Sequence, residues 1–291
     1  MFTACVVNEP DTGETVWNAA HSYAVGDLAA LVSTHYIYLS LASGIDAGSP
    51  DVTPLRWRKL RPTNKWAAFD WYKSTAIKYT GTLTMTVKPG IITDMAFFGL
   101  QGDTIRVVCK YAATGVVYYD SGLVSLSLYL SGDLEWEFWF GTPKQQAGYR
   151  ISGLYPADAQ VEITLTASLV TGVAAIGIWC LGSFAPIGSP DYGFTCEAVD
   201  YSRIKIDDYG DIEIDKGLNT TNLTGTCEMN DKAEAQAAAD VVQANLGTPC
   251  AYVIVDDADH DYLNAFGLGS AKISPTNAKK TTLSLTVKGV I

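Results

Sequence analysis

Histidine is scarce in this chain, and no short catalytic motif surrounds it. The three histidines are His21, His35 and His260. The sequence holds no G-x-S-x-G elbow, no H-E-x-x-H helix, no P-loop and no G-x-G-x-x-G turn. A Ser-His-Asp triad is a spatial arrangement, so spacing along the chain leaves that alternative open. These residues favour a protein that is not an enzyme.

Two acidic runs have the residue types of a cation site. The run 256–261 carries alternate acids, as the first half of a calcium loop does. With Asp257 as the first ligand position, Tyr262 stands where the loop needs glycine and Leu268 where it needs glutamate. An adventitious divalent ion is the open alternative there, and the run 207–211 is typical of a solvated turn. We therefore expect no metal and no cofactor.

A pair of carboxylates on one strand is the arrangement that a glycosidase would use. Glu135 and Glu137 share a face, about 6.6 Å apart at ~3.3 Å per residue, which fits either hydrolase geometry. Alternate acids are also common on a solvated sheet. A polysaccharide-degrading enzyme is therefore the less favoured alternative. Trp139, Tyr118 and Tyr119 are aromatic residues that would stack on sugars if exposed, with ordinary sheet packing as the competing interpretation.

Aromatic residues are concentrated in the stretch 17–70. The alternation in 35–41 is typical of a strand, and the Gly26–Asp27 step suits a tight turn. Aromatic rings bind sugars by stacking, so this stretch supplies the candidate glycan-binding residues, with core packing of Trp57 as the alternative. The candidates are Trp17, Tyr23, Tyr38 and Trp57.

The order of these residues resembles the small chitin-binding-type carbohydrate-binding modules. That pattern has a Trp, a Tyr, a Gly-Asp pair, a Tyr-bearing strand, a Pro and a closing Trp, and here Pro50 or Pro54 takes the proline place. The resemblance implies a small aromatic-rich β domain over 1–62. It also implies contact with a glycan.

The continuation, 62–70, resembles a junction in tail proteins of tailed bacteriophages. The resemblance implies a structural component of a phage tail tip or baseplate, with a contribution to host-surface attachment. The implied partners are other tail or baseplate proteins, further copies in a ring of three or six, and a host-surface glycan. The implied location is the virion tail, assembled in the host cytoplasm. A glycan-binding receptor-binding protein or tail-fibre adaptor is the alternative.

After the aromatic stretch, most of the predicted elements are strands. Alternating runs at 83–87, 104–108, 134–140 and 161–166, with turn residues between them, predict a β-sandwich or jelly roll over 63–187. From 188 to 291 the pattern predicts an α+β domain with one helix at 231–246, capped by Asp231. This unit resembles the small domains of tail-tube and distal-tail proteins, which close rings by extending sheets between subunits.

Composition sets the remaining expectations. The net charge is −11, and 191–261 alone holds sixteen acids and four bases, so no basic groove predicts specific nucleic-acid binding. No apolar run is long enough for membrane insertion, and the first residues predict no signal peptide. The six cysteines form no C-x-x-C pair, which favours mostly free, buried thiols, with Cys227 and Cys250 as the pair to watch.

Overall fold

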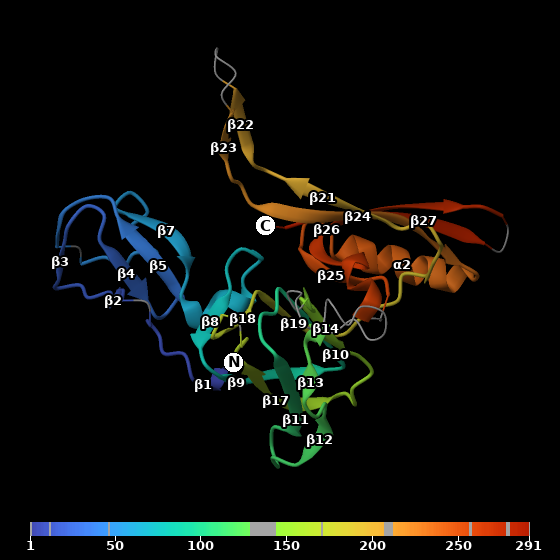
Figure 1. Ribbon diagram of the computed structural model, residues 1–291, viewed down its shortest axis with the longest axis horizontal. Coiled ribbons are helices and arrows are strands. Elements are labelled where there is room, and N and C mark those ends of the chain that lie inside the picture. The colour runs from blue at the N-terminus through green and yellow to red at the C-terminus, as the bar shows by residue number, and fades with distance from the viewer. Residues whose placement is uncertain are drawn as a thin grey trace, which may run out of the picture.

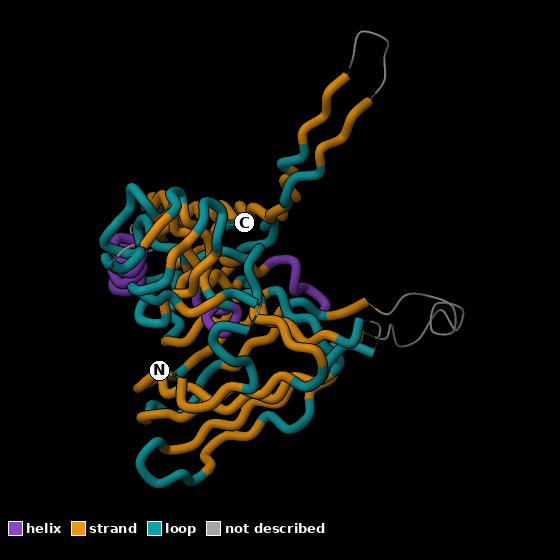
Figure 2. The backbone as a smooth tube through the Cα atoms, turned by 90° about the vertical axis from the view of Figure 1, so that its left-hand side faces the viewer, coloured by secondary structure: helices purple, strands orange, loops and turns teal. Residues whose placement is uncertain are grey.

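The computed structural model describes residues 2–11, 13–45, 47–128, 144–169, 171–206, 212–255, 258–277 and 280–290. Within them, strands hold 52% of the residues and helices 9%, which confirms the prediction of a mainly β fold. Figure 1 shows three β bodies: an aromatic module, a β-sandwich and a C-terminal unit. A hairpin stands out from the C-terminal unit (Figure 1 and Figure 2).

The aromatic module is built on a four-stranded sheet of order β2-β4-β5-β7. Strand β2 is parallel to β4, the other neighbours are antiparallel, and β3 pairs separately with β6. The bounds are β2 Thr15–Val16, β3 Ser22–Tyr23, β4 Leu28–Leu31, β5 Tyr36–Ser40, β6 Gly44–Ile45 and β7 Trp57–Pro62. The turn expected at Gly26 is present, because Gly26 takes a φ of 96° and the Asp27 carboxylate accepts a hydrogen bond from Ala24 N at 2.6 Å.

The middle body is a sandwich of two antiparallel sheets. The larger sheet has the order β1-β9-β17-β11-β12, with β13 also on β11, and the smaller has the order β16-β10-β19. Alternate residues of the larger sheet, such as Met85, Val107 and Ile163, pack against Phe97 and Trp179 of the smaller one. The strands predicted at 83–87, 104–108 and 161–166 lie within β9, β11 and β17, whereas 134–140 lies outside the described residues.

The bounds of the strands in the larger sheet are β1 Phe2–Cys5, β9 Leu83–Ile92, β11 Thr104–Tyr111, β12 Val117–Asp120, β13 Val124–Ser125 and β17 Ala157–Thr166. Those in the smaller sheet are β10 Asp94–Phe98, β16 Gly148–Ile151 and β19 Ile178–Gly182. Two further pairs flank them: β8 Ile77–Thr80 with β18 Val173–Ile176, and β14 Ser127–Leu128 with β15 Lys144–Gln145.

The boundary between the first two bodies differs from the expected one. Strand β1 pairs with β9 of the sandwich, with Cys5 opposite Met85, so the module does not include the start of the range 1–62. Four residues carry too little pattern to reveal a partner some eighty positions away. The module is therefore inserted into the sandwich, and a 3-10 helix, η1 (Asn64–Phe69), returns the chain to it. Six residues are also too few to show a helical period in the sequence.

The C-terminal unit has one large antiparallel sheet of order β20-β24-β27-β26-β25, with β21 also on β24. The bounds are β20 Ser189–Pro190, β21 Thr195–Asp200, β24 Asn219–Met229, β25 Cys250–Val253, β26 Asn264–Pro275 and β27 Thr281–Gly289, with a 3-10 helix η2 at Ala258–Leu263. Helix α2 (Lys232–Ala244) covers one face of this sheet through Ala238 and Val242. Asp231 occupies the expected N-cap position, although Glu234, not the Asp231 side chain, accepts a hydrogen bond at this end, from Asn230 N at 3.1 Å.

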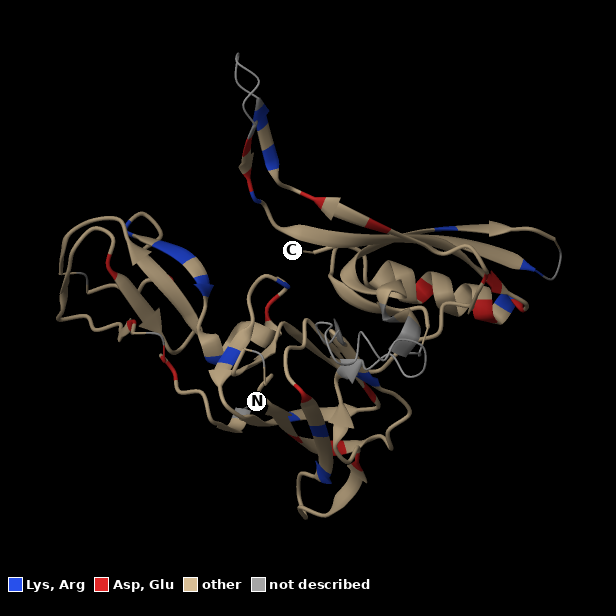
Figure 3. Cartoon of the chain, in the orientation of Figure 1, with Lys and Arg blue, Asp and Glu red and all other residues tan. Residues whose placement is uncertain are grey.

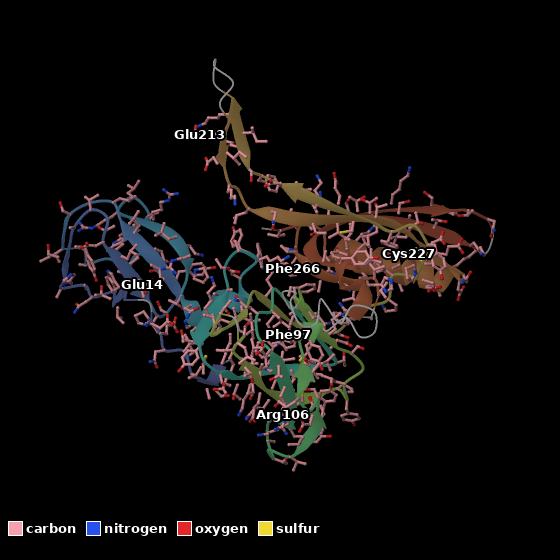
Figure 4. The ribbon with its side chains drawn as sticks, viewed as in Figure 1. Glu14, Phe97, Arg106, Glu213, Cys227 and Phe266 are labelled. Carbon is pink, nitrogen blue, oxygen red and sulfur yellow. The ribbon has the colours of Figure 1, made fainter. Side chains whose placement is uncertain are left out.

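An apolar cluster joins the C-terminal unit to the sandwich. Ala96, Phe98 and Ile178 of the sandwich are buried against Ala251 and Phe266 of the C-terminal unit. The Phe98 and Phe266 ring centroids are 6.2 Å apart, and Figure 4 shows Phe266 on the side of its unit that faces the sandwich. The two bodies are thus packed on each other and not merely linked.

Candidate functional site

The four aromatic residues expected to bind a glycan form the core of the module instead. Trp57 and Tyr23 are each 2% exposed, with ring centroids 4.9 Å apart in an edge-to-face contact. Tyr38 is buried beside them, and Trp17 is half-buried against the same cluster. A sugar ring needs an exposed aromatic face, which Tyr23, Tyr38 and Trp57 do not present. These aromatic residues are buried because a domain this small needs its largest apolar side chains to form its own core.

Of the other sugar-binding candidates, two are half-buried and three lie outside the described residues. Tyr118 and Tyr119 are half-buried and pack against the sandwich core, which favours ordinary sheet packing. Burial raises the pKa of both phenols to about 12. The carboxylate pair Glu135 and Glu137, together with Trp139, lies outside the described residues.

Strand β7 carries a run of basic residues, visible along the edge of the module in Figure 3. Neighbours within the module engage several of them. The Lys59 ammonium lies 3.4 Å from the centroid of the Tyr36 ring, and Arg61 forms an ion pair with Glu14 at 2.6 Å. These contacts favour the interpretation that the basic side chains cover the aromatic surface of their own module.

No metal-binding cluster is found in the part of the chain that the structure describes. No group of three or more His, Cys, Asp or Glu side chains there is arranged to hold a metal ion. The three histidines contact different rings: His21 lies against Tyr23, His35 against Trp66 and His260 against Tyr262. The first two acids of the run 256–261, like the whole of 207–211, lie outside the described residues.

A cavity of about 760 Å³ lies between the sandwich and the C-terminal unit, and Cys180, Cys227 and Cys250 are among its lining residues. Burial, with a smaller contribution from the neighbouring Cys250 thiol, raises the pKa of the Cys180 thiol to about 12, so Cys180 stays protonated at neutral pH. All six cysteines are free, as expected, but only Cys109 and Cys227 are buried, whereas Cys5, Cys180 and Cys250 are half-buried and Cys196 is exposed. Burial also raises the pKa of the Cys227 and Cys250 thiols, so the three thiols that line the cavity are protonated at neutral pH.

The feature that sequence reasoning placed least well is the projecting hairpin, which we call the arm. It consists of β22 (Arg203–Ile206) and β23 (Ile212–Asp215), whereas the sequence indicated only a solvated turn at 207–211. Ile204 lies opposite Ile214, and these side chains are 66% and 59% exposed. On the other face Lys205 forms an ion pair with Glu213 at 3.5 Å, and Figure 4 shows Glu213 on the arm, away from the body.

The root of the arm is fixed by hydrogen bonds. The Asp200 carboxylate accepts hydrogen bonds from the Ser202 backbone N and hydroxyl at 2.9 and 2.7 Å, which lowers the pKa of Asp200. The Ser202 hydroxyl oxygen in turn accepts a hydrogen bond from Gly217 N at 3.0 Å. Gly217 lies so close to the Tyr201 backbone that a methyl group there would overlap it. The arm therefore leaves the body in a defined direction.

A second exposed feature follows η1 directly. Trp71 and Tyr72 are adjacent, 59% and 56% exposed, and Trp71 borders the cavity between the bodies. This pair lies just beyond the aromatic stretch 17–70 and was not among the predicted site residues. The neighbouring W-A-A-F-D-W-Y spacing would have identified it.

Comparisons with protein-family models, with curated proteins and with solved structures found no significant match for this chain. Among the described helices, none combines the length and the apolar character needed to cross a membrane.

Proposed function

We propose that this chain is a structural component of a bacteriophage tail tip or baseplate, which assembles with copies of itself and with other tail proteins and contributes to host-surface attachment. The phage context rests on the resemblance in 17–70. The assembly role rests on one structural observation, the arm.

The arm is expected to be only marginally stable in an isolated molecule. A two-stranded hairpin is marginally stable in water unless a third element covers its apolar face. Here Ile204 and Ile214 stand exposed, yet hydrogen bonds at Asp200, Ser202 and Gly217 hold the hairpin out from the body. Each isoleucine would contribute about 1.5–3 kcal/mol if fully buried. A second molecule covering this face would supply that burial, which is what an assembly contact requires.

The body behind the arm is suited to a structural role. The cluster around Phe98 and Phe266 joins the sandwich to the C-terminal unit. At the other end, Glu9 accepts hydrogen bonds from Thr63 and Trp66 and so ties the module to its return segment. A subunit built in this way holds its contact surfaces at fixed separations.

The test is the native mass of the purified chain over a concentration series, followed by negative-stain imaging of any large species. We expect assemblies of three or six subunits, seen as rings. A monomer of 31.3 kDa at every concentration would contradict self-assembly, and imaging of the chain mixed with candidate tail proteins would then decide whether any assembly role remains.

Glycan binding is the second candidate, and the pair Trp71 and Tyr72 is the observation that favours it. Two adjacent exposed rings beside a cavity are a stacking surface of the kind sugars use. We expect Trp71→Ala to abolish retention on host polysaccharide, while Tyr192→Ala, which removes another exposed ring from the C-terminal unit, retains it. Equal retention by both variants and the unmodified chain would remove this candidate.

A further inference from the structure

The interior of the cavity between the sandwich and the C-terminal unit has no part in the proposed function. Its volume of about 760 Å³ lies within the range of small-molecule pockets, which often form where two bodies meet. We infer that this cavity binds a small, uncharged aromatic molecule that carries a hydrogen-bond acceptor. The inference goes beyond the proposed function and does not depend on it.

Aromatic rings line the cavity from both bodies. Phe69 of η1 and Trp179 of β19 contribute from one side, and Tyr252 of β25 and Phe266 of β26 contribute from the other. Figure 4 shows Phe266 at this junction. Aromatic side chains pack well on a further ring in offset or edge-to-face contacts, and the three lining thiols behave as small, polarisable apolar groups. The lining therefore favours an aromatic ligand.

The charged groups of the lining are already engaged by the protein. Three of the thirty described residues that line the cavity carry a charge, namely Asp70, Asp94 and Arg150. Asp94 accepts hydrogen bonds from two backbone N–H groups, each at 2.9 Å. Asp70 accepts one from a backbone N–H at 2.9 Å and one from the Thr75 hydroxyl at 2.5 Å, and Arg150 is not free either. A charged ligand would lose its hydration without gaining an opposite charge, so an uncharged one is favoured.

One polar group at the cavity still lacks a partner. Trp179 is 3% exposed, and its indole Nε1 has no hydrogen-bond partner in the described part of the chain. Buried polar groups are nearly always hydrogen-bonded, because a buried donor without an acceptor is destabilising. Since Trp179 lines the cavity, an acceptor on a bound molecule would complete this bond. A carbonyl oxygen attached to an aromatic ring system is the acceptor we expect.

The test is the binding of prodan, an uncharged naphthalene dye with one ketone, whose fluorescence shifts to shorter wavelength when it leaves water. We expect saturable binding of one dye molecule per chain, with that shift. The anionic dye anilinonaphthalene sulfonate has the same ring system and should bind about tenfold more weakly or worse, because its sulfonate finds no opposite charge. Absence of saturable prodan binding, or equal affinity for the two dyes, would overturn the inference.

Labelling of cysteines locates the bound dye in the unmodified chain. Cys250 lines the cavity and is half-buried, whereas Cys196 is exposed and is not among the lining residues. We expect saturating prodan to slow the reaction of Cys250 with N-ethylmaleimide, followed by mass spectrometry, and to leave the reaction of Cys196 unchanged. If Cys250 reacts equally fast with and without the dye, the dye binds elsewhere and the inference is wrong.

Two alanine-to-tryptophan variants form a matched pair. Ala185 is an exposed lining residue, so the indole of Ala185→Trp competes for the cavity and should weaken prodan binding about tenfold. Ala113, exposed in the turn after β11, does not line the cavity, and Ala113→Trp should bind like the unmodified chain. Circular dichroism checks the folding of both variants, and the labelling result decides if Ala185→Trp fails to fold. Equal binding by two folded variants would contradict the inference, and the proposed function would be unaffected because no readout involves self-assembly.

Discussion

Glu9 joins the aromatic module to the segment that follows it. Its side chain is 9% exposed. The carboxylate accepts hydrogen bonds from the Thr63 hydroxyl at 2.8 Å and Trp66 Nε1 at 3.2 Å, and His35 Nδ1 lies 2.9 Å from the same group. The His35 ring stacks on Trp66, with centroids 4.0 Å apart. One carboxylate thus joins three residues that come from the module and from η1.

We expect Glu9→Gln to loosen this attachment, because an amide group presents a donor where the pocket supplies donors. The expected loss is about 1–3 kcal/mol, the cost of leaving a buried hydrogen-bonding group without its partner. Denaturant unfolding followed by tryptophan fluorescence measures it. Glu213→Gln, at a side chain that is 75% exposed, is the control and should leave the unfolding free energy unchanged. Equal midpoints for the two variants would show that Glu9 contributes nothing.

At this scale the sequence revealed residue types but not the direction of side chains. The cluster of aromatics in 17–70 and the turn at Gly26 could be read from the pattern. Which rings lie inside could not, because both faces of strands β4 and β5 are apolar or aromatic and alternation alone does not say which face is covered. Trp57 and Tyr38 were therefore candidates for binding until their burial was known.

Among the elements, the arm depends on a close approach of its two chain segments at the root, where Gly217 lies against the Tyr201 backbone. Gly217→Ala would place a methyl group on the Tyr201 backbone. We expect the root hydrogen bonds to be lost and the segment 200–218 to exchange its amide hydrogens faster, measured by mass spectrometry, with the sandwich unchanged. Gly182→Ala, where an added methyl meets no atom within 4 Å, is the control. Unchanged exchange in both variants would mean that Gly217 is dispensable.

Elements were predictable where a local pattern specifies them and not where a distant partner does. Helix α2 and strands β9, β11, β17 and β24 follow from periodicity and capping within a few residues. Strand β1 was assigned to the wrong body because its partner, β9, lies far along the chain. A turn at 207–211 was predictable from its residues, but the projection of the arm from the body was not, because a local pattern does not encode how far an element stands from the rest of the chain.

For the molecule as a whole, the contact between the sandwich and the C-terminal unit decides whether these two bodies unfold together in one transition or separately in two. The Phe98 and Phe266 rings meet at its centre. We expect the unmodified chain to unfold in one calorimetric transition and Phe266→Ala to unfold in two, because the coupling between the bodies is lost. Phe194→Ala, which truncates a half-buried ring packed on the C-terminal core, should lower that core's stability without splitting the transition. One transition in both variants would show that other contacts couple the bodies.

The insertion of the module has a mechanical consequence. Because β1 precedes it and η1 follows it, the module is tethered to the sandwich by two lengths of chain. A pull on the module is shared between these tethers and reaches the sandwich at two separate places, β1 at an edge of the larger sheet and η1 beside β19. A domain appended by one linker would swing under the same load. Here the two connections carry the force together, so the module resists rotation relative to the sandwich.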